Sequence, residues 1–128
     1  MRILAFIALA LFSSQAYPYA DKDVEGYSER YQSCSIKAEG SYTYILACQG
    51  KELAVQDARL NEAYSTIMRR LAPAERSILR TSERHWLRLK DKKCALPRDK
   101  SGLSGLVDSR ECRLDETLRR TLWLKRYR

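Results

Sequence analysis

The feature that most constrains the fold is an apolar stripe with the period of an α-helix. Its members recur at steps of seven, four, three and four residues and are Leu53, Leu60, Tyr64, Ile67 and Leu71. These spacings place the side chains on one helical face. Pro73 follows, and proline stops a helix because it lacks the backbone donor and restricts the preceding residue. The pattern predicts a long helix from about Tyr44 to Leu71 that needs partners along this face.

A second helix is predicted directly after this break. Pro73 suits a first-turn position, and Glu75 lies near the positive end of the helix dipole. The predicted apolar stripe consists of Ile78, Leu79, Trp86 and Leu89. The helix should end near Cys94, since Pro97 lies just beyond it. The short connection at residues 71–74 makes the first two helices antiparallel neighbours.

A third helix is expected near the C-terminus. Residues 95–106 contain Pro97, Gly102 and Gly105 and are predicted to form a loop. Asp108 or Ser109 would then cap the helix. Its apolar side chains are Leu114, Leu118 and Leu122, extended by Trp123 and Tyr127. We therefore predict an all-α fold, a small disulfide-stapled antiparallel helical bundle with about three main helices. Residues 21–33 could add a short helix.

The N-terminus has the layout of a secretory signal peptide. Arg2 supplies a positive charge, the ten residues from Ile3 to Phe12 carry none, and small residues follow at Ser14 and Ala16. We expect cleavage after Ala16, with Ala20 as the rival, and a single domain over residues 17–128. The apolar run is about half of the roughly 20 residues that span a bilayer. The chain is therefore predicted to be exported, either periplasmic or secreted.

Four cysteines then indicate disulfides, because an exported chain with an even number usually oxidises them. Cys94 and Cys112 bracket the predicted loop, and Cys34 and Cys48 bracket a turn at Gly40. We predict these two local pairings, each contributing on the order of 3 kcal/mol. A zinc site would need closer ligand pairs, and the chain has one histidine, so no metal is expected.

The charge is strongly basic and uneven. The formal net charge is +8 at pH 7, and residues 69–100 hold eleven basic and four acidic residues. This distribution favours a basic face that meets an acidic partner. Nucleic acid is not expected as the partner because of the predicted export, whereas an anionic envelope polymer would suit the same charges.

The sequence does not favour catalysis. His85, the one histidine, adjoins Trp86 on a predicted helix and offers no obvious nucleophile to activate. Glu75, Glu83 and Asp91 lie among basic residues, which favour the ionised carboxylate over the protonated form that a general acid needs. There is no glycine-rich phosphate loop. We expect no enzyme activity and no cofactor.

Two motifs carry a family resemblance. Leu60-Asn61-x-x-Tyr64 is followed by a segment from Glu83 to Cys94 that contains Trp86 and Asp91, then by Glu111-Cys112 and a helix with Thr117 and Arg120. This order, over roughly Cys34 to Leu124, resembles the lysozyme-inhibitor LprI-like domain family. Glu83 stands where the family usually has glutamine, and Lys90 where it usually has arginine. Lysine cannot form the two parallel hydrogen bonds that an arginine guanidinium makes to one partner, so any such contact at Lys90 would be altered. We expect Leu60, Asn61, Tyr64, Trp86 and Asp91 to be structural.

The resemblance implies an exported binding protein that blocks a muramidase-type cell-wall hydrolase such as lysozyme. An alternative is a periplasmic immunity protein against a secreted toxin, or an envelope-stress module that binds another acidic partner. A glycosidase cleft contains two carboxylates, which a well-placed cation could engage. The expected binding residues are Arg98, Lys100 and Gly102 in the loop, and Arg84 and Arg88 on the basic helix.

Overall fold

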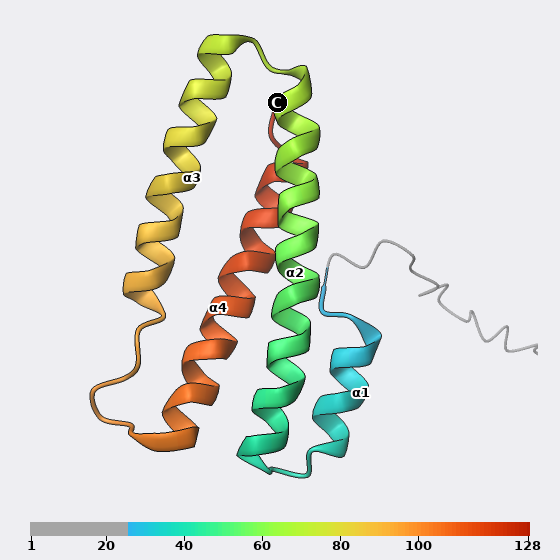
Figure 1. The fold of residues 1–128 in the computed structure, drawn as a ribbon, viewed down its shortest axis with the longest axis vertical. Coiled ribbons are helices and arrows are strands. Elements are labelled where there is room, and N and C mark those ends of the chain that lie inside the picture. The colour runs from blue at the N-terminus through green and yellow to red at the C-terminus, as the bar shows by residue number, and fades with distance from the viewer. Residues whose placement is uncertain (1–25) are drawn as a thin grey trace, which may run out of the picture.

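The computed structural model describes residues 26–128, which form four helices and no strand (Figure 1). The helices are α1 (Glu29–Lys37), α2 (Tyr42–Arg70), α3 (Pro73–Lys93) and α4 (Gly102–Lys125). The all-α prediction is confirmed, with the short α1 added to the three main helices. The predicted signal peptide at residues 1–16 lies outside the described residues. No helix of residues 26–128 is long and apolar enough to cross a membrane.

Local chemistry explains most of the helix ends. Ser28 and Ser41 cap α1 and α2, their hydroxyl groups accepting the backbone N–H of Tyr31 at 3.1 Å and of Tyr44 at 3.5 Å. α2 stops before Pro73, which opens α3 as predicted. The Glu75 carboxylate accepts the backbone N–H of Ala72 at 2.9 Å. This bond satisfies one donor that the first turn of α3 leaves free.

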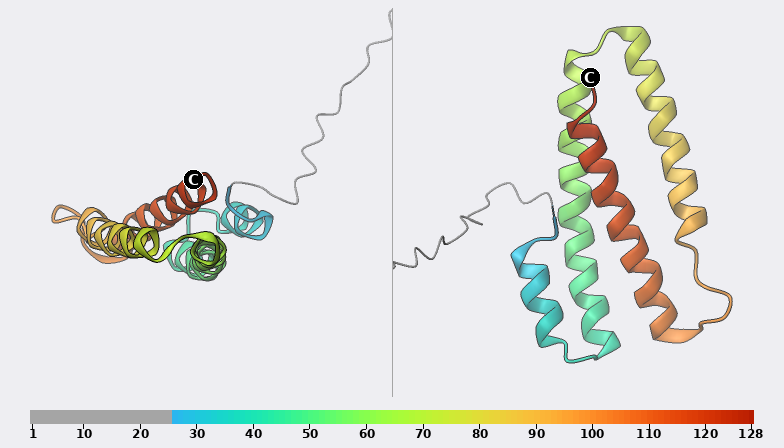
Figure 2. Two further views of the ribbon diagram at one scale, coloured as in Figure 1. Left: turned by 90° about the horizontal axis from the view of Figure 1, so that it is seen from above. Right: turned by 180° about the vertical axis from the view of Figure 1, so that it is seen from behind.

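The helices are not arranged as simple sequential neighbours. α2 packs mainly against α4, with α1 on its other flank, and α3 joins the bundle mainly through α4. α2 and α4 run in the same direction, and the rear view in Figure 2 shows α4 crossing in front of α2, between α2 and α3. The predicted antiparallel course of α2 and α3 is correct. The prediction that α2 and α3 pack closely as neighbours is wrong, because the two helices diverge below their connection (Figure 1).

Two apolar clusters form the core. The larger one contains Leu60, Ala63, Ile67, Leu71, Leu79 and Leu124. The smaller one contains Tyr31, Cys48 and Leu114. The stripe predicted for α2 is therefore largely confirmed. The stripe predicted for α3 is wrong at Ile78 and Leu89, which are 64% and 51% exposed. Leu79 is the buried residue of α3, since this helix meets the bundle along a narrow side.

The third main helix begins earlier than predicted. α4 starts at Gly102, which has a φ of +75°, rather than near Asp108 or Ser109. A Cβ atom at Gly105 would lie 2.7 Å from the carbonyl oxygen of Lys100. Glycine at this position therefore lets the first turn of α4 pack against the preceding loop. The predicted loop at residues 95–106 is shortened accordingly, because residues 102–106 are helical.

Both predicted disulfides are present. Cys34–Cys48 ties α1 to α2 with a Cα–Cα distance of 5.8 Å, and Cys94–Cys112 ties the end of α3 to α4 with a distance of 5.4 Å. Cys112 lies within α4 rather than at its beginning, because the helix starts ten residues before it. The two cross-links hold both peripheral helices to the central α2–α4 pair.

Candidate functional site

A groove of about 370 Å³ lies between α2 and α3. Its lining residues are Leu60, Asn61 and Tyr64 from α2, and Arg80, Glu83, Arg84, Trp86 and Leu87 from α3. The groove therefore brings together the two sequence motifs that lie about twenty residues apart. Asn61 is exposed, whereas Leu60 is buried and Tyr64 is half-buried against the core. The motif of α2 thus gives the groove one exposed polar side chain, Asn61, and two side chains, Leu60 and Tyr64, that pack in or against the core.

An ion pair anchors the α3 side of the groove to α4. The Glu83 Oε1 atom lies 2.6 Å from Nη2 of Arg120 and accepts a hydrogen bond from its Nε at 2.7 Å. The Arg120 Nη2 atom also donates to Ser82 Oγ at 2.8 Å. The side chains of Arg120 and Glu83 are only 11% and 14% exposed. Because Glu83 is matched by Arg120, its charge in the groove is largely neutralised.

Trp86 is half-buried rather than a fully enclosed core residue. The Lys90 ammonium group lies 4.6 Å from the centroid of its ring, and the Arg120 guanidinium lies 5.7 Å away. The same guanidinium lies 3.8 Å from the ring centroid of Trp123. A cation–π contact needs a positive charge but no bidentate fork. Lys90 can therefore make this contact with Trp86 without the guanidinium group of an arginine.

Asp91 lies on the part of α3 that is tied to α4. Its Oδ1 atom accepts a hydrogen bond from Arg113 Nη1 at 2.7 Å. Lys93, two residues further on, pairs with Glu116 of α4. Together with Cys94–Cys112, these contacts hold the C-terminal end of α3. Asp91 thus contacts α4 and is not among the groove residues.

A row of arginines runs along α3 in four-residue steps. Its members are Arg76, Arg80, Arg84 and Arg88. Like charges four apart on a helix cost about 0.2–0.5 kcal/mol per pair. Arg80, Arg84 and Arg88 are exposed and form no ion pair within the described chain. Arg80 and Arg84 line the groove and Arg88 does not. Arg80 and Leu87 were not among the binding residues predicted from the sequence, although Arg80 belongs to the basic row of this helix and its four-residue spacing from Arg84 could have indicated it.

The second candidate region is the loop at residues 94–101, which joins α3 to α4 at the end of the bundle (Figure 1). Arg98 and Lys100 are both exposed, but they differ in their partners. Lys100 Nζ lies 2.5 Å from Asp108 Oδ2, and this hydrogen bond raises the pKa of Lys100. Arg98 has no ion-pair partner among residues 26–128. It is therefore the more available cation of the loop.

Several contacts fix both ends of this loop. The buried Cys94 is bonded to Cys112, and its carbonyl oxygen accepts a hydrogen bond from Ser109 Oγ at 2.6 Å. The close approach at Gly105 adds a contact at the other end. Gly102 is exposed in the first turn of α4. The loop thus presents Arg98 from a constrained backbone.

Comparison with known proteins identifies the family. The family model described as Lysozyme inhibitor LprI matches residues 34–124. The chain belongs to the LprI family. The match includes both disulfides, the groove and the constrained loop, and it confirms the resemblance seen in the sequence. No curated protein and no solved structure matches the chain.

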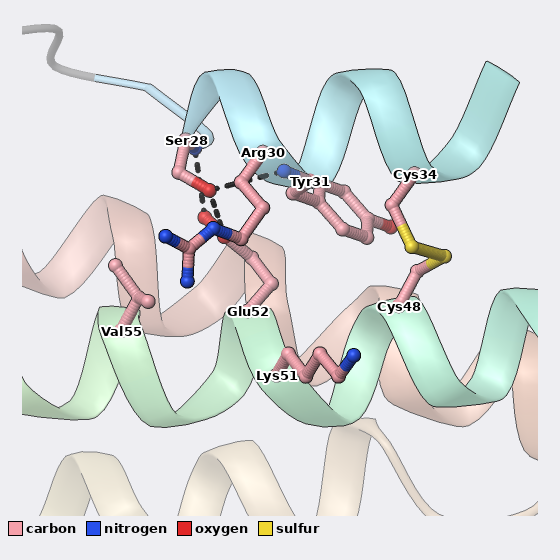
Figure 3. Close-up of a pocket in the computed structure, with 8 residues that line it drawn as sticks. All are labelled: Ser28, Arg30, Tyr31, Cys34, Cys48, Lys51, Glu52 and Val55. Atoms are coloured by element: carbon pink, nitrogen blue, oxygen red, sulfur yellow. Dashed lines mark hydrogen bonds between the residues drawn. A yellow bond between two sulfur atoms is a disulfide. The ribbon is translucent and has the colours of Figure 1, made fainter. Parts of the chain in front are cut away.

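The LprI match begins at Cys34, beside a small pocket between α1 and α2 (Figure 3). Glu52 is 2% exposed, and its carboxylate accepts hydrogen bonds from Ser28 N at 2.9 Å, Ser28 Oγ at 2.5 Å and Gln56 Nε2 at 2.7 Å. These donors compensate the buried charge. The pocket measures about 40 Å³, enough for water but not for a larger ligand. We assign it a structural role in holding the start of α1.

The LprI family is named for an inhibitor and is not a known enzyme family. In residues 26–128 there is no cluster of three or more His, Cys, Asp or Glu side chains that could hold a metal ion. His85 is exposed on α3. The exposed cations of the groove and of the loop make these two regions the candidates for binding.

Proposed function

We propose that this protein is an exported inhibitor of a lysozyme-type muramidase and that it acts by binding rather than by catalysis. The match to the LprI family over residues 34–124 carries the proposal. The two disulfides support export, since such bonds persist mainly in oxidising compartments. Lysozyme is thus the first protein partner to test, and no cofactor is needed.

The loop at residues 94–101 supplies the inhibitory element. Muramidases hold two carboxylates beside the bond they cleave. A guanidinium group can bind a carboxylate through two parallel hydrogen bonds, which a lysine cannot do. Arg98 is exposed and free of an ion pair within the described chain, while Lys100 is held by Asp108. We therefore assign Arg98 the contact with the cleft and Lys100 a role in shaping the loop.

The constrained backbone makes such a contact less costly. Binding loses the conformational freedom of any segment that becomes ordered. The loop is already fixed by Cys94–Cys112 and by the Lys100–Asp108 pair. Less entropy is then lost when the loop enters a cleft than for an open chain of the same length.

The test compares two single variants that remove one positive charge each. Arg98→Ala should weaken inhibition by about 2–5 kcal/mol, because it leaves a carboxylate of the cleft without its cation. Lys92→Ala is the matched control, since Lys92 is an exposed cation on α3 without an ion pair in the described chain. The control should inhibit like the wild type. The measurement is the inhibition constant against a panel of lysozymes at low and high salt.

Two results would contradict the proposal. If the wild type inhibits no muramidase in the panel, the function is wrong. If Arg98→Ala and Lys92→Ala inhibit equally well, the loop is not the inhibitory element. Capture from envelope extract would then distinguish a secreted toxin from an anionic polymer as the actual partner.

A further inference from the structure

We propose that the groove between α2 and α3 binds a carboxylated sugar, such as the muramyl unit of a cell-wall glycan. Such a ligand joins an anionic group to a ring with apolar faces and hydrogen-bonding substituents. The choice of this particular sugar rests on the proposed function, whereas the chemistry of the site rests on the groove itself. The groove is separate from the loop that carries Arg98.

Two unpaired arginines supply the anion-binding part of the site. Arg80 and Arg84 are exposed, line the groove and form no ion pair within residues 26–128. They lie one turn apart, which separates their Cα atoms by about 6 Å along the helix axis. Both guanidinium groups can therefore reach one carboxylate or two neighbouring acceptors. Their mutual repulsion is a cost that a bound anion would relieve.

The acidic residue in the groove does not oppose an anion. Glu83 lines the groove, but its carboxylate lies 2.6 Å from the Arg120 guanidinium. The pair is largely buried, so Glu83 adds little net negative charge to the site. The groove therefore keeps the positive charge of Arg80 and Arg84.

The remaining lining suits a sugar ring. Tyr64, Trp86 and Leu87 provide apolar and aromatic surface. Exposed Asn61 offers both an amide donor and an acceptor to hydroxyl or acetamido groups. Small-molecule sites typically measure about 300–1,000 Å³ and combine apolar walls with a few polar groups. The groove, at about 370 Å³, lies within this range.

The distribution of apolar residues favours a small ligand over a partner helix. A helix with its side chains is about 10–12 Å wide and needs a long apolar surface. The other exposed apolar residues of α3, Ile78 and Leu89, lie on the opposite side of the helix from Leu87. The apolar surface therefore ends at the groove. An acidic helix could pair with the arginines, but the groove lacks the long apolar surface that a bound helix needs.

The test is a titration that does not involve lysozyme. The probe is the disaccharide of N-acetylglucosamine and N-acetylmuramic acid, and the matched ligand is the disaccharide of N-acetylglucosamine alone, which lacks the carboxylate. We expect saturable binding of the carboxylated sugar, with affinity at least about tenfold higher than for the neutral one. Chemical shifts in an NMR titration should change at Asn61, Trp86 and Leu87.

The variants separate a specific site from diffuse charge. The double variant Arg80→Ala with Arg84→Ala should lose about tenfold or more in affinity. Arg88→Ala is the matched control, because Arg88 continues the same row outside the groove, and its affinity should stay within about twofold. Arg84→Lys should bind less well than wild type, since lysine keeps the charge and loses the fork.

Several outcomes would overturn the inference. They are absence of binding to the carboxylated disaccharide, equal binding of the neutral sugar, and equal loss in the Arg88→Ala control. A groove variant that loses lysozyme inhibition while its sugar binding is unchanged would assign the groove to the enzyme instead. The titration contains no lysozyme. A negative result would therefore overturn sugar binding by the groove without bearing on inhibition by the Arg98 loop.

Discussion

At the residue scale, the interior of this bundle is unusually polar. Gln49, Glu52 and Gln56 of α2 are buried, as are Thr117 and Thr121 of α4. The threonine hydroxyls donate to carbonyl groups one turn earlier, at 2.8 and 3.0 Å. Gln49 Nε2 crosses to α4, where it donates to Val107 O and to Glu111 Oε2 at 3.1 Å each. Polar side chains thus fill positions that an apolar stripe would usually occupy.

The Glu83–Arg120 pair gives a prediction about stability. Glu83→Ala should lower the free energy of unfolding by about 3 kcal/mol, because it leaves Arg120 largely buried without its counter-charge. Asp115→Ala is the matched control. Asp115 pairs with Arg119 on the exposed surface of α4, and such a pair contributes roughly 0.3–0.5 kcal/mol to the free energy of unfolding. Denaturant unfolding measures both variants. Similar losses for the two variants would contradict the structural role of the buried pair.

Tyr31 gives a prediction about alkaline pH. Burial, followed by the hydrogen bond that its hydroxyl donates to Glu111 at 3.0 Å, raises the pKa of Tyr31 to about 12. Above about pH 10 the unfolded chain loses this proton while the folded chain retains it. The stabilisation is therefore complete below pH 10 and is lost as pH rises to about 12. Tyr31→Phe should show a smaller fall in stability over this window, and an equal fall would contradict the assignment.

At the element scale, the sequence predicted some boundaries and missed others for physical reasons. Pro73 fixed the end of α2 and the start of α3 because proline acts locally. The start of α4 was missed because Gly102 and Gly105 resemble loop residues, whereas Gly105 allows the first turn of α4 to approach the backbone of Lys100. The burial of Ile78 and Leu89 was wrongly predicted, since periodicity alone does not say how much of a face finds a partner.

The limited packing of α3 gives a third prediction. Only Leu79 of this helix is buried, and ion pairs and one disulfide supply much of its remaining attachment. We expect amide hydrogen exchange to be faster in α3 than in α2 and α4. Replacing both Cys94 and Cys112 with alanine should destabilise the protein by about 3 kcal/mol and accelerate exchange most in α3. Uniform acceleration across all helices would contradict this view of α3.

At the scale of the whole molecule, the basic net charge affects the rate at which the protein associates with a charged partner. The formal charge, +8 for the full chain and 23 − 16 = +7 once the proposed signal peptide with Arg2 is removed, repels a basic lysozyme at long range. If the partner is basic, its association rate should rise with salt, because salt screens this repulsion. Stopped-flow binding at two ionic strengths measures the effect. A rate that falls steeply with salt would indicate an acidic partner instead.

The candidate sites were only partly predictable, because a sequence pattern does not show which side chains find partners. The sequence identified Arg84, Arg98 and Lys100 as exposed cations. It could not show that Asp108 holds Lys100 or that α3 diverges from α2 to leave a groove. The Lys100–Asp108 pair depends on where α4 begins, whereas the groove depends on how α2, α3 and α4 pack, to which residues distant in the sequence contribute.

The most direct test of the proposed function is inhibition kinetics on a muramidase with varied substrate concentration. Because Arg98 is assigned to the catalytic cleft, inhibition should be competitive, and a short oligosaccharide that fills the cleft should displace the inhibitor. Arg98→Ala should raise the inhibition constant without changing the competitive pattern. Absence of inhibition across the panel, or inhibition that cleft-filling oligosaccharide does not relieve, would contradict the proposal.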